Sequence, residues 1–304
     1  MFLCVSHASR QSFRQVCIHT VDSDIGIYAI YFQNILDAKM LVETGTGARR
    51  RILKIDEISK ELGVNCCKAL PGIHAFTGND YTSAFHGIGK IKAYKTMVES
   101  DEFVHAFGKI GEHFDFNAEY FSTIEKFVCT LYGATQCRDV NEARYVKFCS
   151  SAKATEPEKL PPTRDALLYH CKRVNYVTAV VKRSLENNPV VPEPHEGYGW
   201  SLEDGKLEIK WMLLPPAPPQ VLELITCGCK KGCRSRTCSC VAHGIKCTVL
   251  CKCKDCTNSL DDFSDEYASD DSSESDDEEE ESADDDDDDL STDSDDDGIN
   301  LRDV

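Results

Sequence analysis

The 304-residue sequence lacks long hydrophobic runs and has few tryptophan and methionine residues. Its longest apolar stretch, residues 25–32, is only about eight residues long. A membrane helix needs about 20 such residues. The first ten residues, MFLCVSHASR, are too short and too polar to make a convincing signal peptide. We therefore expect neither a membrane partner nor a secretory route.

Positive charge is almost absent from the C-terminal tail. Residues 261–304 contain 24 acidic residues and one arginine, a net charge of −23, whereas the first 260 residues carry +5. The tail has too few apolar residues to form a core, so we expect it to be disordered. Its serines lie among acids, where phosphorylation would add further charge. It is either a solubilising extension or a segment that engages histones and other basic proteins, or competes with DNA for the basic body.

Apolar residues are also scarce between residues 227 and 256, where nine cysteines occur in thirty residues. Such a segment cannot fold by burying a hydrocarbon core, so either disulfides or a bound metal must hold it. The nine candidate metal ligands are Cys227, Cys229, Cys233, Cys238, Cys240, Cys247, Cys251, Cys253 and Cys256.

The odd number of cysteines favours metal over disulfides. Zinc takes four ligands in a tetrahedron, so three zinc ions need twelve ligand positions. Nine cysteines fill them if three sulfurs each bridge two ions. Basic residues offset the thiolate charge: Lys230, Lys231, Arg234, Arg236, Lys246, Lys252 and Lys254. We expect about three zinc ions per chain, with a disulfide knot as the alternative. The eight cysteines elsewhere are expected to be buried thiols.

The cysteine segment resembles the tesmin-like CXC domain in its paired Cys-x-Cys units and in its ending, Cys251, Cys253, Cys256 and Asn258. Residues 227–240 also resemble the CXC segment that precedes the methyltransferase domain of Polycomb-group enzymes. The resemblance implies a three-zinc cluster, contact with DNA or chromatin, and a nuclear location. DNA-reading members of the tesmin-like group carry a tyrosine before the fourth cysteine, where this chain has Thr237.

The N-terminal part alternates between strand and helix patterns, which indicates an α/β fold. We expect a strand that begins near residue 15 and ends at an acidic turn, a helix to residue 32, strands at 39–43 and 52–55, and then a helix with Ile58, Leu62 and Val64 on its apolar face. Pro71 should bend or restart the next helix. The turn formed by Gly87, Gly89 and Lys90, with Lys92 beyond it, is either a plain turn or a phosphate-binding helix start.

Residues 15–115 resemble the C-terminal half of the flap-endonuclease (XPG-type) nuclease domain, a PIN-like fold. Residues 20–24 (TVDSD) are similar to the family's T-x-D-x-D motif, 77–81 (TGNDY) to its G-x-D-Y motif, and 86–93 (HGIGKIKA) to its helix-hairpin-helix turn. The resemblance implies a partial PIN-like parallel sheet with a helix-hairpin-helix extension. It also implies that Asp22, Asp24 and Asp80 bind one Mg²⁺ or Mn²⁺ ion and that the glycine turn binds duplex backbone.

The family's remaining metal ligands lie in an N-terminal half that has no counterpart here. The resemblance therefore implies an incomplete two-metal site and a sheet with an unprotected edge. We assign no catalytic residue. Asp22 and Asp24 have a simpler explanation as a turn and helix cap at a strand end.

The rest of the chain is expected to be largely helical up to residue 188. Helical patterns place Phe103, Phe107 and Ile110 on one face and residues 121–132 on another. Thr163 should cap a long helix whose basic face, including Arg173 and Lys182, is either solvated, as we expect, or in contact with phosphate. A small hairpin with Trp200 and Trp211, and with strand 207–213, precedes the polyproline spacer 215–219. We divide the chain into a partial PIN-like domain (1–118), a helical region (119–188) that contains a linker at 152–162, a Trp hairpin and Pro-rich linker (189–220), a CXC zinc domain (221–260) and the acidic tail (261–304).

This order of parts, over most of residues 15–260, resembles a class of invertebrate proteins associated with mobile elements. The favoured hypothesis is a nuclear, zinc-containing protein that associates with nucleic acid or chromatin and carries a degenerate nuclease-like domain. One alternative is an active, Mg²⁺-dependent, structure-specific endonuclease whose N-terminal half is missing from this chain. Another is a zinc-dependent scaffold for protein interactions.

Overall fold

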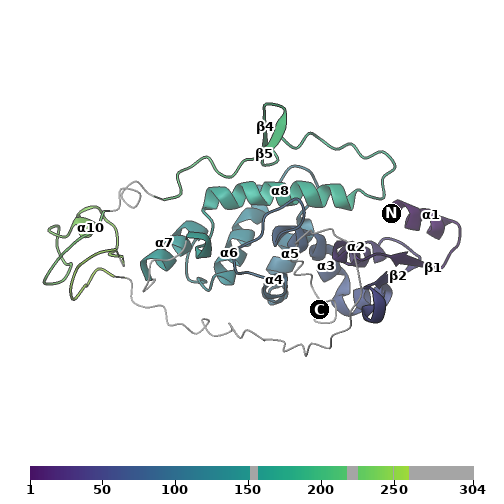
Figure 1. Ribbon diagram of the computed structural model, residues 1–304, viewed down its shortest axis with the longest axis horizontal. Helices are drawn as coiled ribbons and strands as arrows, with labels where there is room; N and C mark the ends of the chain where they lie inside the picture. The colour runs from purple at the N-terminus through teal and green to yellow at the C-terminus, as the bar shows by residue number, and fades with distance from the viewer. Residues whose placement is uncertain (151–156, 218–224, 249, 260–304) are drawn as a thin grey trace, which may run out of the picture.

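The structure, a computed structural model, describes residues 1–150, 157–217, 225–248 and 250–259 (Figure 1). It is a mixed α/β protein with a three-stranded sheet, a helical body, a two-stranded hairpin and a cysteine-rich module. The acidic tail, residues 152–156 of the expected linker and residues 218–219 of the expected polyproline spacer lie outside the described residues. In the described part, no helix is long and apolar enough to cross a membrane.

The larger sheet has the strand order β1-β2-β3, formed by Gln15–His19, Lys39–Thr44 and Arg51–Lys54. β1 runs parallel to β2, with Cys17 opposite Leu41, as the alternation of strand and helix predicts. β3 is antiparallel to β2, so the expectation of a parallel sheet is wrong for this strand. Only residues 45–50 separate β2 from β3, and a parallel return needs a crossover of a dozen or more residues.

Helices α2 (Ser23–Gln33) and α3 (Ile55–Phe76) follow the strands. The break in α3 is at Gly63, whose φ of +76° is non-helical, and not at Pro71 as predicted. Glycine adopts this backbone conformation at little cost, whereas Pro71 is accommodated inside the second segment of the helix, where it is buried. The kink also rotates the following residues, so Val64 is 52% exposed and does not belong to the predicted apolar face.

The predicted apolar faces of the next helices are confirmed. α4 (Lys90–Val98) leads into α5 (Asp101–Lys109), and α6 (Phe121–Leu131) packs beside them. Phe103, Phe107 and Ile110 are buried, as are most of the apolar residues of α6. The sequence patterns did not predict α1 (Phe2–Arg10) or α7 (Val140–Ser150).

The long helix α8 (Arg164–Lys182) lies across the helical body, as Figure 1 shows. Thr163 caps it as predicted, because its hydroxyl accepts a hydrogen bond from the Ala166 amide at 3.1 Å, but the helix ends at residue 182 rather than 188. The prediction of a solvated basic face is wrong. Arg173 is only 2% exposed, and Lys182 donates hydrogen bonds to the carbonyls of Gly108 and Ile110 at the end of α5.

One hydrophobic core extends from Phe2 to Val174, across the boundary expected between residues 118 and 119. Phe76 lies near its centre, with ring centroids 5.2 Å from Phe107 and 5.9 Å from Phe127. His170 Nε2 is 2.9 Å from the Phe76 carbonyl oxygen, and burial lowers the pKa of His170 to about 4. This histidine is therefore neutral and joins α8 to the end of α3.

The hairpin consists of β4 (Trp200–Glu203) and β5 (Lys206–Ile209). Its two turn residues, Asp204 and Gly205, have φ angles of +50° and +76°, the conformation that an Asp-Gly turn favours. The second strand is shorter than the predicted 207–213. The segment around the hairpin is held on α8 by Arg173, which donates hydrogen bonds to the carbonyl oxygens of Gly199 (3.1 Å) and Lys210 (2.9 Å).

Candidate metal centre and candidate nucleic-acid cleft

The cysteine module, residues 225–259, lies at the end of the molecule opposite the sheet (Figure 1). Its described residues have almost no regular structure apart from the short helix α10 (Ser239–Ala242). Its two terminal segments run side by side, because the amides of Lys252 and Lys254 donate hydrogen bonds to the carbonyls of Cys227 (2.8 Å) and Cys229 (2.9 Å). This pairing brings the first and last Cys-x-Cys units together.

The interior of the module consists of sulfur. Its buried core residues are Cys227, Cys233, Cys238, Cys240 and Cys247, with the other four cysteines, Val241 and Ile245 packed against them. All nine cysteines carry free thiols, so no disulfide holds the module. A hydrocarbon core large enough to replace the disulfides is absent from the described residues of the module, which leaves metal ligation as the interaction able to stabilise it.

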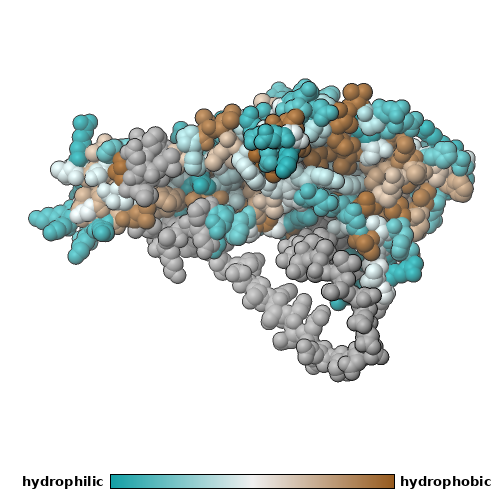
Figure 2. Space-filling model, turned by 45° about the horizontal axis from the view of Figure 1, so that its top comes forward, coloured by the Kyte–Doolittle hydropathy of each residue, from teal (hydrophilic) through white to brown (hydrophobic). Residues whose placement is uncertain are grey.

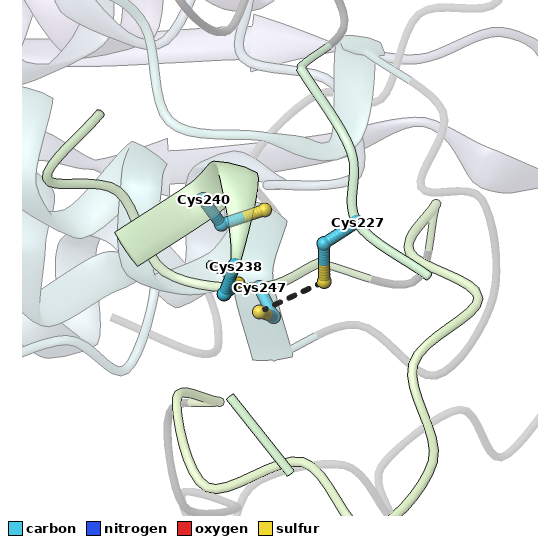
Figure 3. Close-up of side chains that lie close together, drawn as sticks. All are labelled: Cys227, Cys238, Cys240 and Cys247. Carbon is cyan, nitrogen blue, oxygen red and sulfur yellow. Dashed lines mark hydrogen bonds between the residues drawn. The ribbon is translucent and has the colours of Figure 1, made fainter. Parts of the chain in front are cut away.

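Three groups of four cysteines have sulfur atoms that all lie within 4.8 Å of one another. The groups share members: Cys227 belongs to all three, and Cys233, Cys238 and Cys247 each belong to two. Figure 3 shows one group: Cys238 and Cys240 come from the start of α10, and Cys227 and Cys247 come from the segments before and after it. The three groups are Cys227, Cys229, Cys233 and Cys238; Cys227, Cys238, Cys240 and Cys247; and Cys227, Cys233, Cys247 and Cys253.

The spacing of the sulfurs fits a tetrahedral zinc–thiolate site. The Sγ atom of Cys227 lies 3.7 Å from the Sγ atoms of Cys233 and Cys247. Cys240 and Cys251 are 3.5 Å apart. A tetrahedron with Zn–S bonds of about 2.3 Å has sulfur–sulfur edges of about 3.8 Å. The chemistry of the donors and their spacing therefore both suit zinc.

The pKa values of the buried thiols also favour a bound metal ion in the module. Burial raises the pKa of Cys253 to about 11, so a proton occupies this thiol when no cation is bound. At Cys238, burial raises the pKa, but hydrogen bonds from the backbone amide of Val241 and from neighbouring thiols outweigh it and lower the pKa to about 6. A buried thiolate among neutral thiols needs a positive partner, which a metal ion supplies.

Asn258 connects the end of the module to the segment around Cys247. Its side-chain amide donates hydrogen bonds to the Ile245 carbonyl (3.0 Å) and to the sulfur of Cys247 (3.4 Å). The Cys247 amide donates to the Asn258 carbonyl at 3.0 Å. These contacts orient one of the shared sulfurs, which is how residues beyond the ligands support a metal site. Thr237 is exposed and pairs with the Ser235 hydroxyl at 2.6 Å.

A second candidate site is a cleft of about 790 Å³ near the sheet. All three motifs of the predicted nuclease-like region line it: the turn at Asp22–Asp24, the segment that contains Asp80, and the glycine turn that ends at Lys90. The sequence thus predicted residues that the fold brings together from positions up to 68 residues apart.

The glycine turn presents backbone amides to this cleft. Gly87 has a φ of +69°, and Gly89 is the N-cap of α4 and has no side chain that could cap the first amides of the helix. Ile88 is buried and anchors the turn, since its amide donates a hydrogen bond to the Phe85 carbonyl at 3.1 Å. Lys92 lies on the same helix, one turn or less beyond Lys90, and is exposed.

Two of the three acidic residues of the cleft, Asp22 and Asp24, have partners within the protein. The Asp22 side chain caps α2 and accepts a hydrogen bond from the Asp24 amide at 2.9 Å, which confirms the simpler explanation for this residue. Asp24 Oδ1 lies 2.9 Å from Nε2 of the buried His74. Burial raises the pKa of Asp24, but His74 and Lys90 outweigh this effect and lower it. Asp24 is therefore ionised at neutral pH.

The three carboxylates line the cleft without converging on one point. Among the described residues, the only groups of three or more close metal-ligating atoms are those of the cysteine module. Binding of Mg²⁺ or Mn²⁺ by Asp22, Asp24 and Asp80 therefore stays a prediction. His74 was not predicted, because it lies 50 residues from Asp24 and nothing in the local sequence links the two.

Protein-family models, curated proteins and solved structures were compared with the chain, and none of them matches it.

Proposed function

We propose that this protein is a zinc-containing, nucleic-acid-associated protein whose cysteine module holds a cluster of three zinc ions. The observation that carries the proposal is the overlap of the three four-sulfur groups. Separate mononuclear sites would need twelve different cysteines, and the module has nine. Overlapping groups are the arrangement expected when thiolates bridge neighbouring ions.

The bridging sulfurs come from the four shared residues, Cys227, Cys233, Cys238 and Cys247. Three bridging and six terminal thiolates satisfy three tetrahedral ions. Cys251 and Cys256 complete the terminal set, because Cys251 lies against Cys240 and the thiol of Cys256 interacts with Cys247 and Cys253.

The charge of the loaded module favours a polyanion as its partner. Nine thiolates with three Zn²⁺ ions leave a charge of about −3 on the cluster. Seven basic residues surround it, six of them exposed, and none has a carboxylate partner in the described part of the chain. The module is thus cationic at its surface, which suits contact with nucleic-acid phosphates in a nuclear setting. With Thr237 in place of a tyrosine, we propose that it contacts the phosphate backbone rather than reading bases.

The cleft supplies a second surface for the same polymer. The open amides at the start of α4, together with Lys90 and the exposed Lys92, suit a phosphate group. We propose that this turn binds duplex backbone and that the nuclease-like domain, derived from a mobile element, binds nucleic acid without cutting it. Asp24 supports this view because His74 already engages its carboxylate.

Binding can be measured by fluorescence anisotropy with duplex and flap DNA over a salt series. The zinc-loaded chain truncated after Leu260 should bind with a strong salt dependence, and Lys90→Gln with Lys92→Gln should reduce the slope by about two. Lys172→Gln with Lys206→Gln, which removes the same charge outside both surfaces, is the matched control. Binding that is absent or independent of salt would instead favour a zinc-dependent protein scaffold, with histones or other basic proteins reached through the acidic tail.

The second candidate function is a Mg²⁺-dependent nuclease, favoured by the three acidic residues that share one cleft. Flap DNA incubated with the chain and Mg²⁺ or Mn²⁺ tests it directly. Cleavage that disappears in Asp80→Asn would establish the nuclease and overturn the binding-only proposal. Intact DNA under both metals, with binding retained, would support binding alone.

A further inference from the structure

The outer edge of β1 has no strand beside it in the described part of the chain. In the parallel ladder with β2, the carbonyl of Arg14 accepts from the Lys39 amide and the amide of Thr20 donates to the Glu43 carbonyl, so even-numbered residues face β2. The backbone groups of Gln15, Cys17 and His19 therefore face outward. No hydrogen bond between described residues uses them, and all three residues are exposed.

This edge also lacks the features that prevent strands from pairing with other chains. Its outward residues carry no fixed charge, and β1 contains neither proline nor a bulge. The other edge of the sheet, β3, carries Arg51 and Lys54. Edge strands are normally protected by charged residues, by proline or by a cover. α1 contacts β1 and packs through Phe2 onto Phe32 of α2, with ring centroids 4.6 Å apart, but it leaves Gln15, Cys17 and His19 exposed.

Two exposed apolar residues flank the open edge at equal distances from Cys17. Phe13 is 60% exposed and Val21 is 70% exposed, one four residues before Cys17 and the other four residues after it. Figure 2 shows apolar side chains exposed among polar ones at this end of the molecule. A solvent-facing pair with this symmetry matches a two-fold axis through Cys17.

We propose that the free edge of β1 binds a second copy of this chain, antiparallel and in register about Cys17. In this register Cys17 lies opposite the partner's Cys17, Gln15 opposite the partner's His19, and Phe13 opposite the partner's Val21. The outward backbone groups of both strands pair, and the two three-stranded sheets become one six-stranded sheet. The half-buried Val16 lies opposite the partner's Ile18, which continues the apolar face of the sheet across the junction.

The register makes a distance prediction that other modes of association do not share. Residues opposite each other in a hydrogen-bonded antiparallel pair have Cα atoms about 5.5 Å apart, so the two Cys17 thiols are within reach of a short bis-thiol reagent. Sedimentation of the zinc-loaded full chain over a concentration series should show a monomer–dimer equilibrium. Dibromobimane should link Cys17 to Cys17, as identified by mass spectrometry of the joined peptides.

Cys17→Lys places two like charges opposite each other in the dimer. It leaves the β1–β2 ladder unchanged, because the backbone groups of Cys17 point away from β2 and the residue is exposed. It should weaken self-association by about tenfold or more. Cys4→Lys makes the same change at an exposed cysteine of α1 and should leave the dimer intact. Circular dichroism shows whether each variant is folded, and the crosslink in the unchanged chain tests the register even if Cys17→Lys fails to fold.

A monomer at all concentrations, a dimer insensitive to Cys17→Lys in a folded protein, or a dimer without the Cys17 crosslink would each overturn the proposal. So would capture of this edge by a strand of a different protein in preference to a second copy. None of these outcomes bears on zinc content or on salt-dependent DNA binding, so the proposed function can fail or hold independently.

Discussion

Removal of a shared cysteine should cost the module more zinc than removal of an unshared one. Cys238 belongs to two of the four-sulfur groups, whereas Cys229 belongs to only one. Cys229→Ser therefore deprives a single ion of one ligand. Cys238→Ser deprives two ions of a ligand at once and removes the bridge between them.

The expected zinc count of each variant follows from the number of ions that lose a ligand. Wild-type protein should carry about three zinc ions, Cys229→Ser about two, and Cys238→Ser about one or none. Each structural zinc contributes about 10–16 kcal/mol of apparent binding free energy in small zinc domains. Since the interior of this module is sulfur, loss of two ions should unfold it, while the main core between Phe2 and Val174 stays folded.

Native mass spectrometry measures the zinc count directly, and titration of released zinc with a chromogenic chelator checks it in solution. Cys4→Ser, an exposed thiol on α1, is the matched control and should retain about three ions. Equal zinc loss from Cys229→Ser and Cys238→Ser would refute the bridged cluster. A wild-type count of one ion would refute it as well.

In the main body, Arg173→Leu leaves the carbonyls of Gly199 and Lys210 without their donor and should lower the free energy of unfolding by about 2–5 kcal/mol. Lys172→Leu on the same helix should change it by less than about 1 kcal/mol. Urea denaturation measures both. The pKa of Asp24 is lowered in the folded protein, so its stabilising contribution is present above its unfolded pKa of about 3.8 and is lost as the pH falls through the folded value. Asp24→Asn should therefore reduce stability at neutral pH and have little effect in acid. Thermal melts over a range of pH measure this difference. In the same urea assay, Gly78→Ala should destabilise the protein by about 1–3 kcal/mol more than Gly87→Ala. Both glycines have a positive φ, but only at Gly78 would an added Cβ meet a neighbouring side chain, that of Ala84, at 2.8 Å.

Local patterns predicted most of the elements and the cysteine site, whereas the residues of the cleft were predicted from the resemblance of three short motifs. The strands near residues 15 and 39, the helix from Lys90 and the cap at Thr163 depend on residues close in the chain, and the structure has them where the sequence indicates. The cysteine ligands were predictable for the same reason, because thiols crowded into thirty residues have few ways to be satisfied.

Two features were missed because they depend on contacts between distant segments. Arg173 appeared to lie on a solvated face, since nothing near it shows that residues 199 and 210 will cover it. The pairing of His74 with Asp24 likewise joins the last turn of α3 to the first turn of α2. The direction of β3 was missed for a simpler reason, because the short connection from β2 excludes a parallel return.

Arg173 has a further consequence for how the two candidate sites act together. Its hydrogen bonds hold the hairpin segment on α8, and Asp165 extends this attachment by accepting hydrogen bonds from the amides of Leu213 and Leu214. The chain between this last attachment and Ile225 is then only ten residues long, with a maximum reach of about 40 Å. A nucleic acid bound at one site would therefore meet the other at a high effective concentration, and two weak contacts could give one strong association.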